Sequence, residues 1–158
     1  MAAKEHHYEI RAIWRGDAQT PNTNVQGFSR SHQIELAGKP ALDFSSDPNF
    51  QGDPGRNNPE EMLVASLSSC HMLWYLVLCG MKGIVVTDYD DRATGTMLQE
   101  PGKGRFTEVT LHPRVTVAKG SDIAQATKLH ERAHKECFIA NSVNFPVNVE
   151  PDIIEADG

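Results

Sequence analysis

The feature that most constrains this chain is a long apolar stretch at residues 58–80, which reads NPEEMLVASLSSCHMLWYLVLCG. Asn58 is a favourable N-cap, Pro59 suits the first helical position, and the two glutamates that follow complement the positive end of a helix dipole. Residues 62–81 contain no Asp, Glu, Lys or Arg, and large apolar side chains cover most of the helix circumference. The sequence therefore predicts a helix that begins at Pro59 and is buried on nearly all sides.

Cys70 lies in the middle of this helix, flanked by Ser69 and His71. The commonest role of a free cysteine is that of an inert core thiol. A reactive cysteine needs a nearby cation, because apolar surroundings alone raise the pKa of the thiol and disfavour the thiolate. The function of the chain therefore depends on which groups lie beside Cys70.

The apolar run is also long enough to cross a bilayer. However, Ser66, Ser68, Ser69 and His71 interrupt it, and segments with strand-like alternation flank it on both sides. Residues 1–8 are polar and lack the apolar core of a secretory signal. We therefore expect a cytoplasmic protein whose long helix belongs to a folded core, with no membrane partner.

The composition bounds the class of protein. The 158 residues, 39% of them hydrophobic, suffice for one packed domain. We predict a single domain over residues 1–158 with flexible ends at residues 1–7 and 151–158. The net charge of -6 argues against a nucleic-acid partner, because phosphate binding needs a basic surface. The three cysteines, Cys70, Cys79 and Cys137, are too few and too scattered for the disulfide framework of a secreted protein.

Hydrophobic periodicity outside the long helix predicts an α+β domain with antiparallel sheets. Predicted strands cover residues 8–14, 28–36, 41–44, 84–89, 93–99, 105–117 and 145–149, and the fifth and sixth form a hairpin. Residues 47–57 are rich in Pro, Gly, Asp and Asn, which is typical of an ordered loop. A second helix, capped by Ser121 or Asp122, is predicted over residues 123–138, with Cys137 on its inward face near its end.

Arg30 lies on the apolar face of the predicted strand 28–36, together with Phe28 and His32. A buried guanidinium needs a carboxylate or another anion, because an unpaired buried charge costs several kcal/mol. Alternatively, Arg30 lies at the end of the sheet and extends to water. The pattern of this stretch leaves both interpretations open.

A second motif suggests a zinc enzyme. His130, Glu131 and His134 form the pattern H-E-x-x-H, in which two histidines one helical turn apart can bind Zn²⁺. A catalytic zinc site needs a third protein ligand, and the chain has neither the extended motif nor a downstream glutamate on a helix. We therefore predict no metal or cofactor, and a zinc metallohydrolase is the alternative, which equimolar zinc and loss of activity on chelation would support.

The stretch NPEEMLVASLSSCHM, followed by AHKECFIANSVNFPV with Cys137 67 residues after Cys70, resembles the OsmC/Ohr family of thiol peroxidases. The resemblance implies that Cys70 is the peroxidatic cysteine and Cys137 the resolving cysteine. Glu60 matches the family's active-site glutamate. We assign the active-site arginine to Arg30, with Arg56 as the second choice. Cys79 matches no catalytic position, and we expect it in the core.

The resemblance also implies reduction of organic hydroperoxides, and to some extent hydrogen peroxide, in defence against oxidative or osmotic stress. Regeneration would use a dithiol reductant such as a lipoyl group. We expect a guanidinium from Arg30, held by a bidentate pair with Glu60, to stabilise the Cys70 thiolate. Apolar side chains that would favour organic peroxides are Met62, Leu63, Leu73 and Phe138.

Glu60 and Cys70 are ten residues apart, which corresponds to about 15 Å along an uninterrupted helix. Either the helix breaks near Ser66, or Glu60 serves the cysteine of a second subunit. The resemblance implies the second arrangement, an intertwined homodimer with a site at the interface. A non-catalytic binding module for an apolar ligand is the alternative from another functional class.

Overall fold

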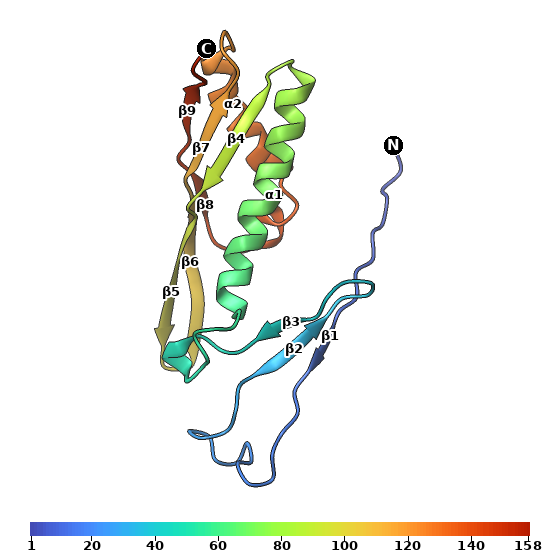
Figure 1. Ribbon diagram of the computed structural model, residues 1–158, viewed down its shortest axis with the longest axis vertical. Coiled ribbons are helices and arrows are strands. Elements are labelled where there is room, and N and C mark those ends of the chain that lie inside the picture. Colours follow the sequence, from blue (N-terminus) through green and yellow to red (C-terminus); the bar gives the residue numbers. More distant parts are fainter. The chain divides into compact units, whose positions relative to one another are not determined.

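The computed structural model describes all residues from Met1 to Gly158, and it confirms the predicted α+β class with antiparallel strand pairs and a long helix (Figure 1). The chain divides into two compact units, Met1–Met62 and Leu63–Gly158. Each unit is described by itself.

The first unit contains a three-stranded antiparallel sheet in the order β1 (Arg11–Ile13), β2 (His32–Glu35) and β3 (Leu42–Phe44). Ala12 lies opposite Ile34, which lies opposite Leu42. The first two strands are shorter than their apolar-polar alternation predicts. Residues 1–10 are exposed and join no ladder, so alternation alone does not extend a strand that has no partner to pair with. A short 3₁₀ helix, η1 (Pro48–Phe50), lies in the predicted loop.

The long helix α1 (Pro59–Met81) begins where the sequence predicts. The Asn58 side-chain oxygen accepts a hydrogen bond from the Glu61 backbone N–H at 2.9 Å, which confirms the N-cap. The helix continues without a break through Ser66, whose hydroxyl donates to the Leu63 carbonyl at 2.8 Å. Of the two alternatives for Glu60 and Cys70, a break of the helix near Ser66 is therefore wrong.

The second unit contains two three-stranded sheets. One has the order β4 (Val86–Asp91), β7 (Pro113–Val117), β9 (Asp152–Glu155), and the other has the order β5 (Thr94–Glu100), β6 (Lys103–Leu111), β8 (Val147–Val149). The pairs β4–β7 and β5–β6 are antiparallel, whereas β8 and β9 join in parallel. The prediction of a flexible end at residues 151–158 is wrong for β9, because its backbone pairs with β7.

The second arm of the predicted hairpin, residues 105–117, is two strands that belong to different sheets. The chain leaves the β5–β6–β8 sheet at His112, whose backbone N–H donates to the side-chain carboxylate of Asp91 at 2.7 Å instead of to a backbone carbonyl. Pro113 has no N–H to donate and begins β7. The alternation of apolar residues continues across this junction, so the sequence pattern does not reveal it.

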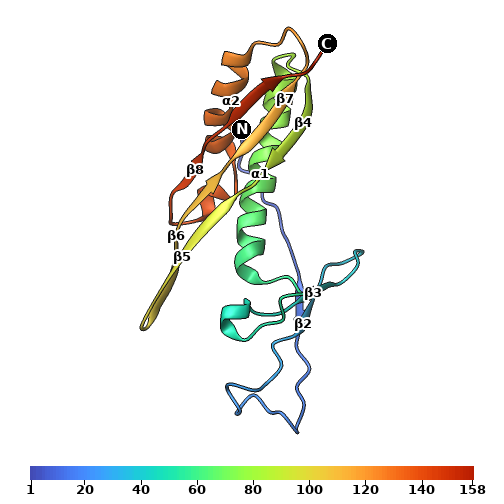
Figure 2. The same ribbon diagram turned by 60° about the vertical axis from the view of Figure 1, so that its left-hand side comes forward.

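The second helix, α2 (Ile123–Glu136), begins at the N-cap Asp122, whose carboxylate accepts from the Gln125 N–H at 2.9 Å. Cys137 is the C-cap, so it lies just beyond the helix rather than within it. In both ribbon views α1 and α2 cover the same face of the strands (Figures 1 and 2). Their buried side chains form one core with β7, composed of Tyr75, Leu78, Cys79, Ile84, Val115, Val117, Ala126, Leu129 and Ala133.

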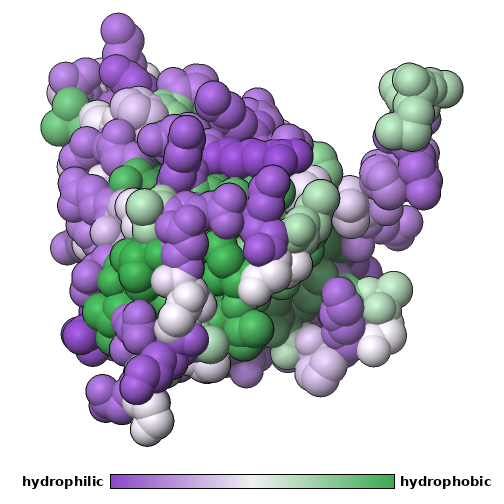
Figure 3. Space-filling view, turned by 90° about the horizontal axis from the view of Figure 1, so that it is seen from above, coloured by the Kyte–Doolittle hydropathy of each residue, from purple (hydrophilic) through white to green (hydrophobic).

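Only one side of α1 is buried within the chain, so the predicted burial on nearly all sides is not reached. Its buried residues are Leu67, His71, Tyr75, Leu78 and Cys79. The opposite stripe is apolar and exposed, with Leu73 57%, Val77 54% and Met81 69% accessible, and apolar side chains are visible on the molecular surface in Figure 3. By length and composition α1 is the one helix of the chain that could cross a membrane. Its packing in the core with α2 and β7 accounts for the same apolar composition.

Candidate active site

The structure brings Cys70 and Cys137 together. Cys70 is half-buried on α1, and Cys137, at the C-cap of α2, is 1% exposed. The Cys70 side chain is close enough to Cys137 to raise the pKa of its thiol, and both cysteines are free thiols. Two neighbouring cysteines can form a disulfide once one of them is oxidised.

The surroundings of Cys137 favour its protonated form. Its pKa is raised to about 11, mainly because burial disfavours the thiolate and in smaller part because of the neighbouring Cys70 thiol. The backbone N–H of Ala140, which donates to the Cys137 Sγ at 3.5 Å, acts in the opposite direction. Cys137 is therefore a neutral thiol at physiological pH.

Aromatic side chains lie beside this thiol pair. Trp74, one turn after Cys70 on α1, contacts Phe138, which follows Cys137, with ring centroids 5.5 Å apart in an edge arrangement. Phe138 is 68% exposed and Leu63 is half-buried. Trp74 and Phe138 present apolar surface beside the thiols, and a preference for organic peroxides remains a prediction.

The two histidines of the H-E-x-x-H motif do not form a metal site. His130 is 2% exposed, and its Nδ1 lies 2.9 Å from the Nε2 of His71 on α1, within hydrogen-bond distance. Nowhere do three or more His, Cys, Asp or Glu side chains converge in a way that could hold a metal ion. Glu131 is exposed. The donor set thus falls short of the three protein ligands that a catalytic zinc uses.

Arg30 belongs to the first unit and precedes β2, so it does not lie on a strand as the alternation predicts. Its guanidinium donates to the Phe28 carbonyl at 2.6 Å and to the Val25 carbonyl, and it stacks 3.9 Å from the centre of the Phe28 ring. No carboxylate pairs with it, so its positive charge is not neutralised by another side chain of the chain. It lines a cavity of about 500 Å³ together with Trp14, Asn22, Phe28, His32, Ser45, Ser46 and Pro59.

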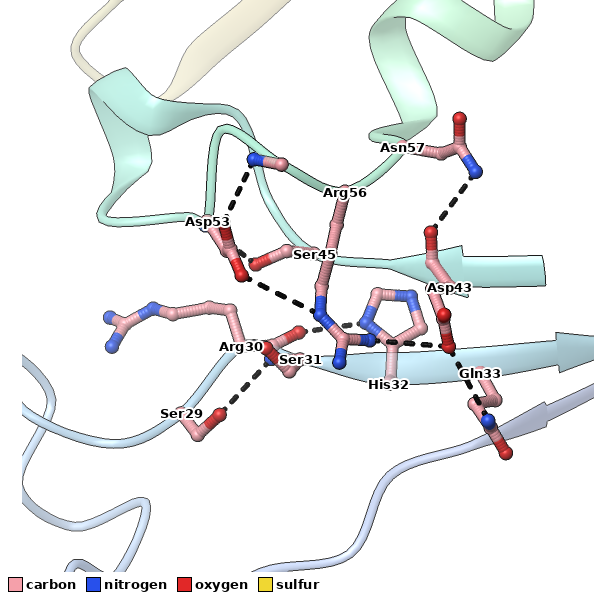
Figure 4. A network of polar contacts seen from close by, with 11 residues as sticks. Ser29, Arg30, Ser31, His32, Gln33, Asp43, Ser45, Asp53, Arg56 and Asn57 are labelled. Carbon is pink, nitrogen blue, oxygen red and sulfur yellow. Dashed lines mark hydrogen bonds and ion pairs between the residues drawn. The ribbon is translucent and has the colours of Figure 1, made fainter.

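Arg56, the second choice for the arginine, is occupied by two carboxylates. Its guanidinium lies 3.4 Å from Asp43 and 3.6 Å from Asp53 (Figure 4). The same two aspartates connect the loop to β3, since the Asp53 N–H donates to Ser45 and the Asn57 amide donates to the Asp43 carbonyl. Figure 4 shows the Arg30 guanidinium extending away from this network. Of the two candidates, Arg30 is therefore the one whose charge is left unpaired for an anion.

Glu60 lies in the first turn of α1 and is half-buried. Its Oε2 is buried and has no hydrogen-bond partner, and Glu60 makes no ion pair with Arg30 or any other residue of the chain. The predicted Arg30–Glu60 pair is thus absent from the single chain. A buried carboxylate oxygen without a partner is costly, so this group calls for a donor from elsewhere.

Cys79, predicted to be a core residue, is fully buried near Tyr75. Burial raises the pKa of its thiol, whereas a hydrogen bond with Tyr75 acts in the opposite direction. The sequence reasoning missed the pairing of His71 with His130. A signal was present, because His71 and Tyr75 share a helix face one turn apart and His130 occupies the apolar face of the second helix.

Comparison with known proteins gives a consistent result. The family model described as OsmC-like protein matches residues 52–152. A solved structure of an OsmC-like protein of unknown function from Vibrio cholerae is 32% identical and superposes with a TM-score of 0.86, covering 95% of this chain and all of that one. The uncharacterized protein YmaD of Bacillus subtilis is 23% identical over 150 residues, which is 92% of each chain.

A third similarity is more distant. The crystal structure of an organic hydroperoxide resistance protein from Elizabethkingia anophelis is 19% identical, with a TM-score of 0.67 over 97% of this chain and all of that one. At this identity the likeness concerns the fold alone.

Proposed function

Since the chain belongs to the family of OsmC-like proteins, we propose that it is a cysteine-based peroxidase that reduces organic hydroperoxides to alcohols. The observation that carries the proposal is that two free thiols, Cys70 and Cys137, are neighbours in the fold. Family members include proteins named for organic hydroperoxide resistance. A role in the response to oxidative or osmotic stress, in the cytoplasm where thiols stay reduced, follows from the proposal.

The reaction needs two cysteines and no cofactor. The Cys70 sulfur, as thiolate, attacks the distal oxygen of the hydroperoxide, the O–O bond breaks, and the alcohol leaves after taking up a proton. Cys70 is then a sulfenic acid. The Cys137 sulfur attacks the Cys70 sulfur, an S–S bond forms, and the S–O bond breaks with release of water. The peroxide gains two electrons, and the two thiols lose them.

The disulfide is reduced by thiol–disulfide exchange with a small dithiol, for which the family resemblance suggests a lipoyl group. Hydrogen peroxide is a smaller substrate for the same chemistry. It gains less from the apolar side chains, such as Phe138, beside the thiols.

We propose further that the active protein is a homodimer in which Arg30 and Glu60 serve a site shared between subunits. Three observations support this: the charge of Arg30 is not neutralised by a carboxylate, the buried Oε2 of Glu60 lacks a partner, and α1 exposes an apolar stripe. The stripe contains Leu73, Val77 and Met81, each more than half exposed. A second copy of the chain covers such a surface with the same residues, as two-fold symmetry requires.

The proposal is tested by the peroxide-dependent loss of free thiols. One equivalent of an organic hydroperoxide is expected to oxidise two thiols per chain, with the mass of Cys70 and Cys137 peptides showing a disulfide. Cys70→Ser is expected to abolish peroxide consumption. Cys137→Ser is expected to allow one turnover and then to leave Cys70 as sulfenic acid. Cys79→Ala, at a buried site outside the pair, is the matched control and should leave consumption intact.

Unchanged peroxide consumption by Cys70→Ser would refute the enzyme and favour the alternative of a binding module for an apolar ligand.

A further inference from the structure

The two helices that carry the thiols are joined by a buried polar contact. His71 of α1 and His130 of α2 are 1% and 2% exposed, and the Nε2 of His71 lies 2.9 Å from the Nδ1 of His130. Their ring planes differ by 6°. The remaining ring nitrogens, His71 Nδ1 and His130 Nε2, are buried and bond no other group of the chain. Each imidazole therefore has the other as its hydrogen-bond partner.

A second contact lies one helical turn away on both helices. Tyr75 follows His71 by four residues, and its hydroxyl donates to the carbonyl of Ala126, four residues before His130, at 3.0 Å. The Tyr75 ring also stacks on the His130 ring, with centroids 3.8 Å apart. Because four residues span about 6 Å in either helix, the two contacts match in spacing and set one antiparallel register.

We propose that the His71–His130 pair, stacked against Tyr75, is a positioning device that fixes the rotation and register of α1 against α2 and thereby holds Cys70 beside Cys137. Cys70 is next to His71, whereas Cys137 follows His130 by seven residues and caps the end of α2. The pair therefore fixes which way Cys70 faces, and the chain that leaves α2 brings Cys137 to it. A shift of one residue turns a helix by about 100°, which would carry Cys70 away from Cys137. The histidines are thus positioning residues that act through the two cysteines.

A hydrogen bond can do this where apolar packing cannot. Apolar burial is not directional, so a helix as uniformly apolar as α1 can pack in several rotations. Any rotation that separates the two imidazoles leaves their nitrogens buried without partners, which disfavours that arrangement.

The protonation state of the pair does not change in the physiological pH range. Burial, with a smaller effect from His134, lowers the pKa of His71 to about 4, while Asp91 acts in the opposite direction. Burial, with a smaller effect from His71, lowers the pKa of His130 to about 3.

The inference rests on the proposed function only in that the Cys70–Cys137 disulfide is an intermediate of peroxide reduction. The role of the histidine pair can be tested without peroxide. The equilibrium between the Cys70–Cys137 disulfide and glutathione measures how well the fold holds the sulfurs together. In a Cys79→Ala background, His130→Leu and His71→Leu are each expected to lower this equilibrium constant about tenfold or more, since the register is no longer specified. The double variant should lose no more than either single variant, because the partners act as one unit.

Conservative variants separate positioning from bulk. In His130→Asn the amide reaches the position of Nδ1, and in His71→Gln it reaches that of Nε2. Both are expected to restore the equilibrium constant to within about threefold, because an amide donates and accepts as an imidazole does. His130→Gln, of similar size but with its amide displaced, is expected not to restore it. Val117→Ala, in the same core but away from the pair, should lower Tm and leave the equilibrium constant unchanged.

Two results would overturn the inference: an unchanged equilibrium constant in folded His130→Leu, or equal behaviour of His130→Asn and His130→Gln. If His130→Leu does not fold, the comparison of Asn with Gln decides. In the unaltered protein, a slowly exchanging ring N–H resonance should persist from pH 5 to pH 9, and its absence would also count against the pair. If the unaltered protein has no peroxidase activity, the proposed function is refuted, but the disulfide equilibrium and the ring N–H resonance still test the histidine pair.

Discussion

The two faces of α1 have the same apolar character but different surroundings. One face, with Leu67, Tyr75 and Cys79, is completely buried against α2 and the strands. The other, with Leu73, Val77 and Met81, is more than half exposed. Cys70 and Trp74 lie at the border between the two faces and are half-buried. The difference teaches that a helix can be apolar on all sides for two reasons: one face packs in the core of its own chain, and the other is available for packing against a second chain. The fold of a single chain accounts only for the first.

The buried face contributes to the stability of each chain, whereas we assign the exposed face to assembly. A border between them is a suitable place for a reactive thiol. There the sulfur has apolar neighbours that exclude water, yet a substrate can still approach from the open side.

The largest effect is expected on the buried face. Tyr75→Ala should lower the free energy of unfolding by about 3–5 kcal/mol, because it leaves a cavity in the core and removes the hydrogen bond from the Tyr75 hydroxyl to the Ala126 carbonyl. Denaturant unfolding followed by circular dichroism measures this. Tyr75→Phe keeps the ring and removes only the hydroxyl, so it should lose about 1 kcal/mol. Equal losses in the two variants would contradict the importance of ring packing.

An intermediate effect is expected on the exposed face. Leu73→Glu should convert a homodimer into monomers of 17.5 kDa, because the charge would be buried at the interface. Light scattering coupled to size exclusion measures the mass. Ala124→Glu places the same charge on an exposed residue of α2 and should leave the mass unchanged. If the unaltered protein already has the mass of a monomer, the comparison between the faces loses its explanation.

The smallest effect concerns the border and the pKa of Cys137. Because this pKa is raised to about 11, the thiolate fraction of Cys137 rises about tenfold per pH unit throughout the physiological range. After peroxide oxidation of Cys70, disulfide closure should therefore accelerate as the pH rises from 6 to 9, as followed by rapid-quench mass spectrometry. The folded state holds the proton more tightly than the unfolded state, so stability contributed by this thiol is present below pH 9 and is lost as the pH approaches 11.

A rate of disulfide closure that does not change over this range would indicate that Cys137 is already a thiolate, and that the site is more polar than its burial indicates. The variant Cys79→Ala tests whether the dependence belongs to Cys137, since the profile should be the same without the third thiol.

Local signals predicted the helices well and the strands less well. Asn58 and Asp122 are caps whose side chains bond backbone N–H groups within their own helix, so their effect is readable from a few neighbouring residues. Strand ends depend on a partner elsewhere in the chain. The division at His112 rests on a hydrogen bond to Asp91, and β9 exists because it pairs with β7, and neither leaves a local pattern.

The same distinction applies to the candidate site. The two cysteines stand out in the sequence because their residue type and surroundings carry chemistry, but their adjacency depends on how α1 packs against α2. Arg30 shows the limit of alternation. The alternation of its neighbours predicts a strand position, where a buried guanidinium would need an anion. The structure instead places Arg30 before β2, where backbone carbonyls accept its hydrogen bonds.

By itself, the sequence determined the class of the fold, the start of the first helix, the start of the second to within one residue, and the identity of the two thiols. These follow from caps, periodicity and residue type within short segments. Only the tertiary structure decided that His71 faces His130, that Cys137 lies beside Cys70, and that one face of α1 stays uncovered. The physical reason is that packing is a relation between segments distant in the chain. Apolar residues specify that they are buried, but directional contacts select the partner against which they are buried.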